Sequence, residues 1–260
     1  MLLYGNNGDR NLISVIIPSY NDDVFLEKAI KSCKISNRYG VELIVVCPIR
    51  PVSTDAIWIR DNGIGIVDAM NIGFHASHGE YVTFMPADWT FNPKWTDAVQ
   101  FVKDMPLKRR NRCAGLIGWG YPKQCGVWMS ERSTLYNDLF QGNIFNPAYY
   151  HHYVDCDTSL MLWIEGEEWL TVPDVCPVTT IQVSTNITQM YDCVDNMIFN
   201  EIWWEIIENK HVDNGYSSIS RDEQIKLFND GLLKSRYYPK TGKRVTLHEY
   251  YTTNLDKLVE

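Results

Sequence analysis

One stretch of the chain, residues 61–89, constrains the fold more than any other. It begins with the Gly-rich letters DNGIG, continues through VDAMNIGFHASHG and ends in the apolar run EYVTFM, which Pro86 follows. Asp68 stands where a helix N-cap is expected, and Gly79 stands where a left-handed C-cap is expected. The apolar run predicts a buried strand that stops at the proline. This strand would leave Asp88 at its carboxyl end, where open α/β sheets bind their ligands.

The residues before this stretch alternate between strand and helix patterns. Apolar runs predict strands at 14–18, 42–47 and 56–60, and apolar residues at helical spacing predict a helix over 24–33. The order over the first ninety residues is therefore strand, helix, strand, strand, helix, strand. Such alternation is typical of an α/β fold with a mostly parallel central sheet flanked by helices. This order of elements is typical of a Rossmann-like nucleotide-binding half-domain.

Weaker patterns follow Asp88. We expect a helix over 93–102, a strand over 113–120, a loop with at most one helical turn over 121–150, a helix over 158–164 and a strand within 166–178. From about residue 194 the pattern changes to amphipathic helices. The first of them, 197–208, carries Glu on its polar face, which favours packing on a protein core over a membrane surface.

Composition narrows the functional classes. The formal net charge of -8 argues against a nucleic-acid partner, because phosphate contacts require a basic face. The basic run 108–112 is most simply a solvated loop, although it could contact a phosphorylated ligand or lipid headgroups. Seven cysteines without a CxxC pair favour reduced thiols, and no signal peptide or membrane-spanning run is visible. We therefore expect a cytoplasmic protein without a transmembrane segment, which could associate peripherally with a membrane.

Two motifs carry a family resemblance. The run SVIIPSYN at 14–21, together with GIVDAMNIG at 65–73, resembles family 2 glycosyltransferases of the GT-A fold, most closely the bacterial polysaccharide-building branch. The resemblance is close over about 14–90 and looser as far as about 178. It implies a domain over 1–193, with a nucleotide-sugar half at about 14–115 and an acceptor half at about 116–193. Residues 194–260 would form a helical C-terminal extension packed on that domain.

The resemblance also implies an activity. Such enzymes move a sugar from a nucleotide-diphosphate donor to an acceptor hydroxyl with inversion, and the acceptor here would be a glycan or a lipid-linked or protein-linked group. The residues that would contact the donor are Pro18, Tyr20, Asn21, Cys47, Asp68, Asn71, Ala87 and Asp88. Cys47 stands where the family usually has an acid that reads the nucleobase, which leaves the identity of the nucleotide open.

The metal site implied by the resemblance is reduced. Family members often hold Mn²⁺ or Mg²⁺ through two acids after the strand at 80–85, and this chain has Asp88 alone. One carboxylate can suffice for Mg²⁺ when substrate phosphates supply further ligands. Asp88 could instead cap the turn before Pro93. The His that the family often adds to the metal is missing from the run TTIQV at 179–183, so a metal-independent enzyme is the alternative.

The catalytic base is expected among two acids. The letters DTSL at 157–160 match the family segment that carries the base, so Asp157 is the favoured base and Asp155 is its neighbour. Both acids could merely cap a helix. Acceptor contacts would come from His151, His152 and Trp163, the last standing where the family often has Arg.

Two other functions remain. A catalytically silent protein of the same fold would bind nucleotide-sugar or glycan as a scaffold or partner, and the missing acids favour it. A nucleotidyltransferase would need a Gly-rich, basic loop after the first strand, and the letters PSYND at 18–22 supply neither property. Intact transfer in Asp157→Asn would show that Asp157 is not the base, whereas a silent protein would bind the donor and turn none of it over.

Overall fold

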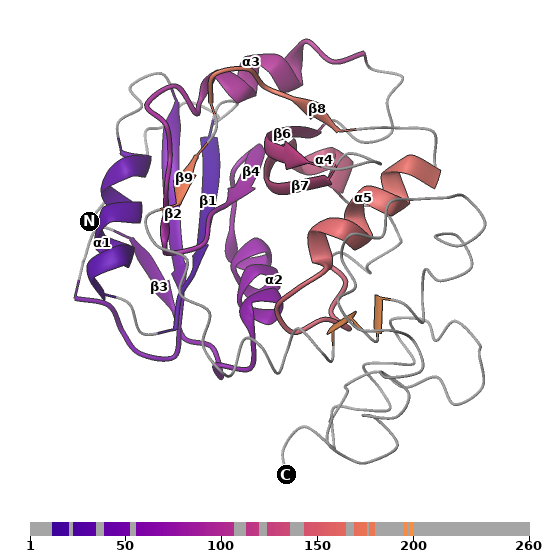
Figure 1. Cartoon of the computed structure of the whole chain (residues 1–260). Coiled ribbons are helices and arrows are strands. Elements are labelled where there is room, and N and C mark those ends of the chain that lie inside the picture. The colour runs from indigo at the N-terminus through magenta and orange to yellow at the C-terminus, as the bar shows by residue number, and fades with distance from the viewer. Residues whose placement is uncertain are drawn as a thin grey trace.

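A seven-stranded sheet forms the centre of the protein in a computed structural model (Figure 1). The structure describes residues 12–20, 23–34, 39–52, 56–106, 113–119, 124–135, 143–164, 169–175, 177–179, 195–196 and 198–199. The strands of the large sheet are β1 (Leu12–Pro18), β2 (Gly40–Val46), β3 (Ile57–Ile59), β4 (Tyr81–Phe84), β6 (Cys113–Trp119), β7 (Gln124–Glu131) and β8 (Leu170–Thr171). β5 (Trp89–Thr90) and β9 (Val178–Thr179) pair separately.

Strand direction confirms the expected mostly parallel sheet. The order across the sheet is β3-β2-β1-β4-β7-β6-β8. β1 pairs in parallel with β2 and β4, β2 pairs in parallel with β3, and β6 pairs in parallel with β8. β7 pairs antiparallel with both of its neighbours, β4 and β6. Since the other six strands share one direction, the carboxyl ends of β1 to β4 lie at a single edge.

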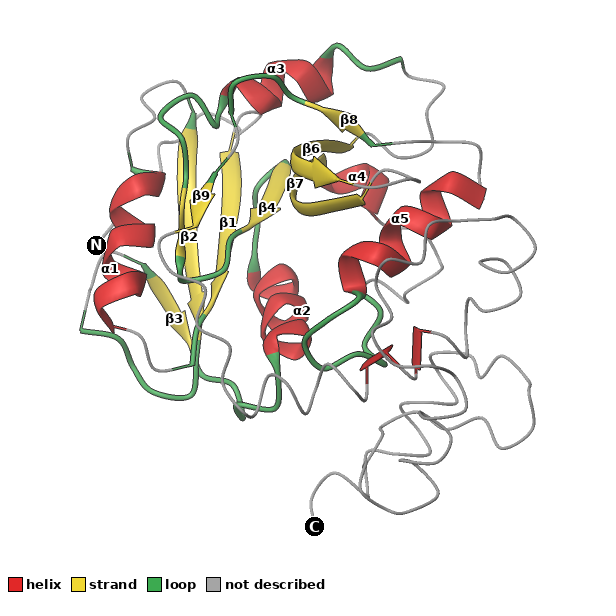
Figure 2. Ribbon diagram, in the orientation of Figure 1, coloured by secondary structure: helices red, strands yellow, loops and turns green. Residues whose placement is uncertain are grey.

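Helices cover both faces of the sheet (Figure 2). They are α1 (Asp23–Cys33), α2 (Ile66–Ala76), α3 (Asp97–Lys103), α4 (Arg132–Leu135) and α5 (Val154–Ile164). Successive residues of β1 point to opposite faces: Val15 and Ile17 pack with residues of α1 and α3, whereas Ile16 packs with residues of α2 and α5. All three are fully buried, as expected for a parallel strand covered on both sides.

The two caps predicted for α2 are wrong. The helix begins at Ile66 with Gly65 as its N-cap, so Asp68 lies inside the first turn. The C-cap is Ser77 in an extended conformation, and Gly79 does not have a positive φ. Gly79 serves a close approach instead, because a Cβ there would lie 2.6 Å from the main-chain nitrogen of Ser14.

Three predicted boundaries also need correction. Residues 124–131, expected as loop, form β7, whose short apolar run VWM is interrupted by Gly and Ser. The helix expected from residue 158 begins at Val154, so neither Asp157 nor Thr158 caps it. The helix expected from Pro93 begins at Asp97 after a run of turns. Of the predicted helix 197–208, only residues 198 and 199 lie within the described residues.

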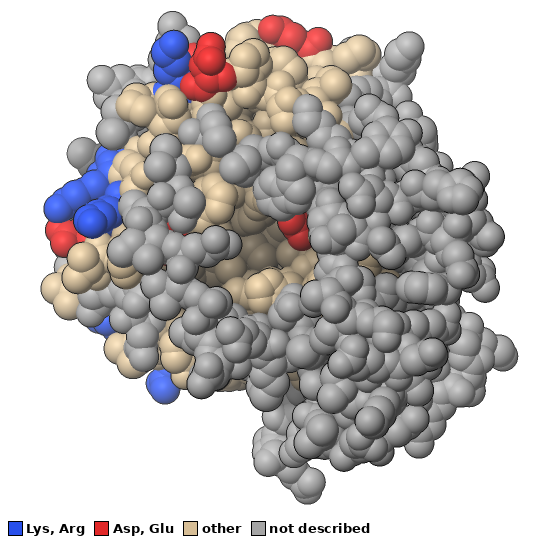
Figure 3. All heavy atoms as spheres, viewed as in Figure 1, with Lys and Arg blue, Asp and Glu red and all other residues tan. Residues whose placement is uncertain are grey.

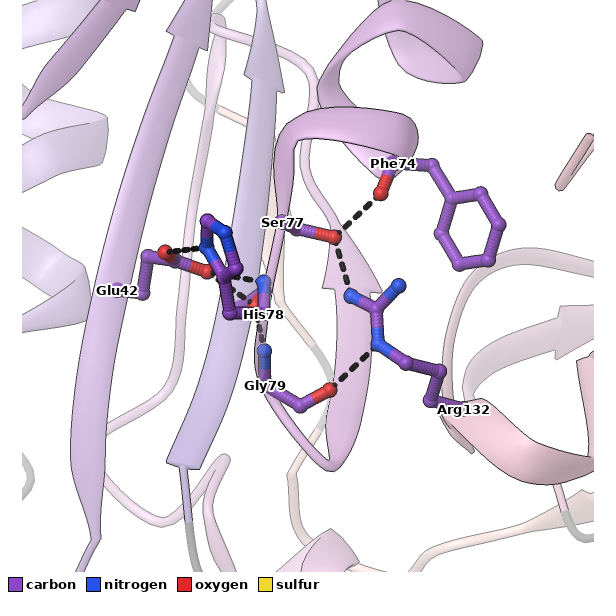
Figure 4. A network of polar contacts seen from close by, with 7 residues as sticks. Glu42, Phe74, Ser77, His78, Gly79 and Arg132 are labelled. Atoms are coloured by element: carbon purple, nitrogen blue, oxygen red, sulfur yellow. Dashed lines mark hydrogen bonds and ion pairs between the residues drawn. The ribbon is translucent and has the colours of Figure 1, made fainter. Parts of the chain in front are cut away.

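A polar network ties the amino-terminal ends of β1 and β2 to the segment between α2 and β4 (Figure 4). The buried Glu42 carboxylate accepts hydrogen bonds from Ser14 Oγ at 2.6 Å and from the His78 main-chain nitrogen at 2.8 Å, and its other oxygen contacts His78 Nδ1 at 2.9 Å. Ser14 Oγ in turn accepts a bond from the Gly79 nitrogen at 2.7 Å. Burial opposes ionisation of Glu42, but these hydrogen bonds outweigh it and lower the pKa of Glu42.

Arg132 extends this network to α4. Its Nε donates to the Gly79 carbonyl at 2.7 Å, and its Nη2 donates to Ser77 Oγ. Its guanidinium lies 4.9 Å from the centre of the Phe74 ring (Figure 4). One side chain therefore joins the end of α2, the start of β4 and the end of β7.

Candidate active site

The expected donor edge lies at the carboxyl ends of β1, β2, β3 and β4. Pro18 is the buried last residue of β1, and Tyr20 follows it with 62% of its surface exposed. Gly63 has φ of 65°, and a Cβ there would lie 3.1 Å from both the Tyr20 ring and Pro48. The turns after three strands therefore meet, and Tyr20 is free to face a ligand. Asn21, also predicted to contact the donor, lies outside the described residues.

Cys47 lies at this edge with its thiol turned toward the chain itself. Its Sγ donates to the Ile49 carbonyl at 2.9 Å, and only 2% of the residue is exposed. Its main-chain oxygen accepts a bond from Trp58 Nε1 at 3.2 Å. The acid that the family resemblance would place here is thus replaced by a buried thiol, and a donor contact by Cys47 stays a prediction.

Asp61 is a candidate that the sequence analysis missed. It follows β3 directly, only 7% of it is exposed, and its Oδ1 has no hydrogen-bond partner. Burial raises the pKa of Asp61, the bond from the Gly63 main chain opposes that shift, and the charge of Asp68 adds to it. A buried carboxyl oxygen without a partner is rare in proteins and is a candidate ligand contact. The sequence did hold one sign of this role, because Asp61 closely follows the third predicted strand and so lies at the carboxyl edge of the sheet.

Asp88 lies in the tight turn that links β4 to β5. The Trp89 nitrogen donates to the Pro86 carbonyl at 3.1 Å, Ala87 is buried, and Asp88 is half-buried. Within the described ranges, no three His, Cys, Asp or Glu side chains gather into a set that could hold a metal. Mn²⁺ or Mg²⁺ bound at Asp88 would therefore need most of its ligands from a bound diphosphate and water.

One face of α2 binds the segment that precedes α5. Val67, Asn71 and His75 are spaced four residues apart, so their positions share a face. The Val67 main-chain nitrogen donates to the Tyr150 carbonyl at 3.1 Å, and His75 Nε2 lies 2.8 Å from Asn143 Oδ1. Residues 143–150 consequently run along α2 in the opposite direction to the helix.

Asn71 makes the middle contact of this set. Its Nδ2 donates to the Phe145 carbonyl at 3.1 Å, and its Oδ1 accepts from the Phe145 nitrogen at 3.0 Å. Only 5% of the residue is exposed. The side chain thus holds a loop on α2, and its predicted contact with the donor stays a prediction. Asp68, on the same helix, is half-buried.

The two acids predicted as base lie in the first turn of α5 in different surroundings. Asp157 is 1% exposed, and its Oδ1 accepts a bond from Tyr149 Oη at 3.0 Å. Asp155 is half-buried, and its Oδ1 accepts a bond from the Cys156 nitrogen at 2.9 Å. Residues two apart on a helix point to nearly opposite sides, so one of the two faces the core and the other can meet a ligand.

The first turn of α5 and the loop before it contain two acidic groups whose pKa values are raised. Burial raises the pKa of Asp155, and this rise is only partly offset by the hydrogen bonds from Cys156 and by the charge of the nearby His152. Burial also raises the pKa of Tyr149, with the charge of Asp157 acting in the same direction. A carboxylate with a raised pKa is a better proton acceptor, which a catalytic base needs.

His151 and His152 are half-buried beside this turn, with ring centres 4.5 Å apart. Burial, with a contribution from His152, lowers the pKa of His151 to about 4, so its ring is neutral near pH 7. The side chain of Trp163 lies outside the described part of the chain. The structure therefore brings both histidines to the start of α5, and their contact with an acceptor stays a prediction.

Asp195 is a second residue that the sequence analysis missed. It is fully buried, and its carboxylate accepts hydrogen bonds from the main-chain nitrogens of Tyr150, His151 and His152. No motif pointed to it, because it lies more than forty residues from the loop that it binds.

The surface is hollowed near the centre of the face shown in Figure 3, and acidic atoms lie at the edge of the hollow.

No described helix is long and apolar enough to cross a membrane.

Comparison with known proteins places the fold. No protein-family model matches the chain, and no curated protein matches it in sequence. Among solved structures, the mannosyltransferase PcManGT from Pyrobaculum calidifontis, in complex with GDP-Man and Mn²⁺, is similar with a TM-score of 0.56 and 16% identity, over 77% of this chain and 65% of that one. S. aureus TarS 1-349 in complex with UDP-GlcNAc is similar with a TM-score of 0.49 and 14% identity, over 85% and 71%.

The similarity to the mannosyltransferase confirms the α/β fold with a mostly parallel sheet, in the arrangement of GT-A glycosyltransferases. This chain spans just under two thirds of the length of the mannosyltransferase. At 16% sequence identity, this comparison supports the fold and says nothing about the substrate.

Proposed function

We propose that the protein is an inverting glycosyltransferase that moves a sugar from a nucleotide-diphosphate donor to the hydroxyl of a glycan, or of a lipid-linked or protein-linked acceptor. One observation carries the proposal: the loop leading into the acid-bearing α5 is bonded to the first turn of α2, whose amino-terminal end belongs to the donor edge. The Tyr150 carbonyl and the Val67 nitrogen make that bond at 3.1 Å. This bond supports the proposal, because it would bring the predicted donor site close to the predicted base.

The donor would bind across the carboxyl ends of β1 to β4. Tyr20 offers an exposed ring for the base or ribose, and Asp61 offers a carboxyl oxygen that has no protein partner. Asp68, in the first turn of α2, and Asp88, between β4 and β5, are the acidic donor contacts predicted from the sequence. The mannosyltransferase with a similar fold was solved with GDP-Man, which supports a nucleotide-sugar as the ligand here.

The base would act from the first turn of α5. In direct displacement the base takes the proton of the acceptor hydroxyl, the oxygen attacks the anomeric carbon, and the bond to the diphosphate oxygen breaks with inversion. The proton ends on the carboxylate and the electron pair on the diphosphate. Between the two predicted acids, Asp155 is the more accessible and has a raised pKa, so we assign it the contact with the acceptor. Asp157, held by Tyr149, is the alternative base.

A divalent metal would neutralise the leaving diphosphate when bound, and Asp88 would be its protein ligand. The mannosyltransferase was solved with Mn²⁺, which supports testing that ion first.

A catalytically silent nucleotide-sugar-binding protein is the second candidate. The Cys47 thiol, bonded to the chain itself, and the burial of Asp157 favour it, because the first cannot supply a carboxylate to the nucleotide and the second shields an acid from an acceptor.

A donor panel tests the proposal. Purified protein is incubated with each common UDP-, GDP- and dTDP-sugar, with and without Mn²⁺ or Mg²⁺, and both thermal shift and nucleotide release are followed. A transferase gives stabilisation and slow nucleotide release with one donor class. Stabilisation without release, even with an acceptor library, supports the silent protein. The absence of any shift with every donor overturns both.

A further inference from the structure

Three consecutive main-chain N–H groups converge on the side chain of Asp195. The Tyr150 nitrogen donates to Oδ1 at 2.8 Å, and the His151 and His152 nitrogens each donate to Oδ2 at 2.7 Å. Successive N–H groups that point to one spot form a concave site for an anion. Here the chain supplies that anion itself, from a side chain with no exposed surface.

The loop and the carboxylate depend on one another. A buried charge is costly unless hydrogen bonds compensate it, so any other conformation of residues 150–152 would leave the Asp195 carboxylate without these donors. The adjoining residues reinforce this arrangement. Asn196 Nδ2 donates to Tyr153 Oη, and the rings of Tyr153 and Phe199 lie 5.2 Å apart. Tyr153 itself has φ of 64°, a conformation that a non-glycine residue adopts only where its surroundings hold it.

Both sides of the anchored loop lead to the candidate site. On one side, the Tyr150 carbonyl reaches the Val67 nitrogen of α2. On the other side, Tyr149 Oη donates to Asp157 Oδ1 at 3.0 Å, and the Asp157 nitrogen donates to the Tyr153 carbonyl at 2.8 Å. Residues flanking the loop therefore contact the first turn of α5.

We propose that Asp195 is a positioning residue for sugar transfer. It fixes residues 150–152 between the donor helix α2 and the first turn of α5, and so sets the distance between the donor and the base. It acts through the loop and does not touch substrate. This inference rests on the proposed function for its catalytic part, whereas the anchoring of the loop stands on the hydrogen bonds alone.

Hydrogen exchange combined with kinetics tests the proposal on the full-length protein. In the wild type, the amides of 150–152 should exchange slowly, although they lie outside helices and strands. Asp195→Asn keeps the shape of the side chain but removes its charge and one acceptor oxygen, so the same amides should exchange at least about tenfold faster. The value of kcat should fall by about tenfold or more, because small displacements of a base are costly, while the donor Kd stays within about twofold.

Asp174→Asn is the matched control. Asp174 lies on an exposed turn with φ of 60°, which Asn also tolerates, and this variant should behave as the wild type. Fast exchange of 150–152 in the wild type overturns the proposal without any variant, even if Asp195→Asn does not fold. Unchanged local exchange in a folded Asp195→Asn, or an equal loss of protection throughout the sheet, also overturns it.

The two proposals fail separately. If the wild type releases no nucleotide from any donor, the transferase proposal falls and the catalytic role of Asp195 falls with it. The exchange of residues 150–152 then still supports or overturns the loop anchor.

Discussion

The main-chain oxygen of Tyr150 lies 3.1 Å from the main-chain nitrogen of Val67 and accepts its hydrogen bond. Gly65 makes this approach feasible, because a Cβ at that position would lie 2.3 Å from the same oxygen. The bond joins the helix of the predicted donor half to the loop that precedes the predicted base. The relative placement of α2 and this loop therefore depends on the absence of a side chain at Gly65.

Gly65→Ala should displace the loop. The clash is with main-chain atoms, which cannot move aside as a flexible side chain can, so we expect a loss of about 1–3 kcal/mol in unfolding free energy. Transfer activity should fall more than donor affinity. Urea unfolding and donor titration measure the two effects. Gly40→Ala is the control, because its Cβ would meet only the end of the Leu12 side chain at 3.2 Å. Equal stability of both variants would contradict this account.

Asn71→Asp should destabilise the protein by about 2 kcal/mol at neutral pH. The new carboxylate still accepts from the Phe145 nitrogen, but it places an oxygen against the Phe145 carbonyl, where Nδ2 now donates. Chemical denaturation gives the difference. Asn92→Asp serves as control, because at that exposed contact the oxygen accepts from the Lys94 nitrogen and the change keeps it. If Asn71 acts only on the donor, stability stays unchanged and donor affinity alone falls.

Glu42 should make stability depend on pH. Its pKa is lower in the folded protein than its usual value of 4.5, so protonation favours the unfolded chain. The contribution is complete above that value and is lost as the pH falls through the folded pKa. Glu42→Gln should remove this acid dependence and cost about 1.5–3 kcal/mol at neutral pH. Thermal unfolding between pH 3 and pH 7 checks it, and parallel pH curves for both proteins would refute the assignment.

Asp61→Asn should separate stability from binding. Burial raises the pKa of Asp61, so the ionised form opposes folding as the pH rises above the usual value of 3.8. A neutral amide removes that cost, and we expect the ligand-free variant to be more stable at pH 7 by about 1 kcal/mol. Donor affinity should fall at the same time, if the unpartnered oxygen contacts the donor. Calorimetry on free and donor-saturated protein measures both, and an unchanged donor affinity would exclude Asp61 from the site.

Local sequence patterns sufficed for the parallel half of the fold. The apolar runs and the helical spacing before residue 90 correspond to β1, α1, β2, β3, α2 and β4, because each element there is long or strongly apolar. β7 was missed because its apolar core is three residues long and Gly and Ser flank it. Its burial comes from packing between α3 and α5 and not from its own pattern.

The candidate site was harder to predict, because its contacts join residues that lie far apart in the sequence. The motif residues Asp68 and Asn71 could be found in the sequence, but the pairing of Asn71 with Phe145 depends on how a distant loop returns to α2. Asp195 was beyond reach, because nothing in its neighbours shows that three N–H groups forty residues earlier will converge on it. Which of Asp155 and Asp157 faces the core likewise follows from tertiary packing.

Nucleotide release by Asp155→Asn and Asp157→Asn, measured against the wild type with the stabilising donor and its acceptor, tests the central claim most directly. The account predicts a fall in kcat of at least about a hundredfold for Asp155→Asn, with donor binding retained and with Asp174→Asn unaffected. A comparable loss confined to Asp157→Asn would move the base to the buried acid. Full activity in both variants would contradict the claim that α5 carries the base of a sugar transferase.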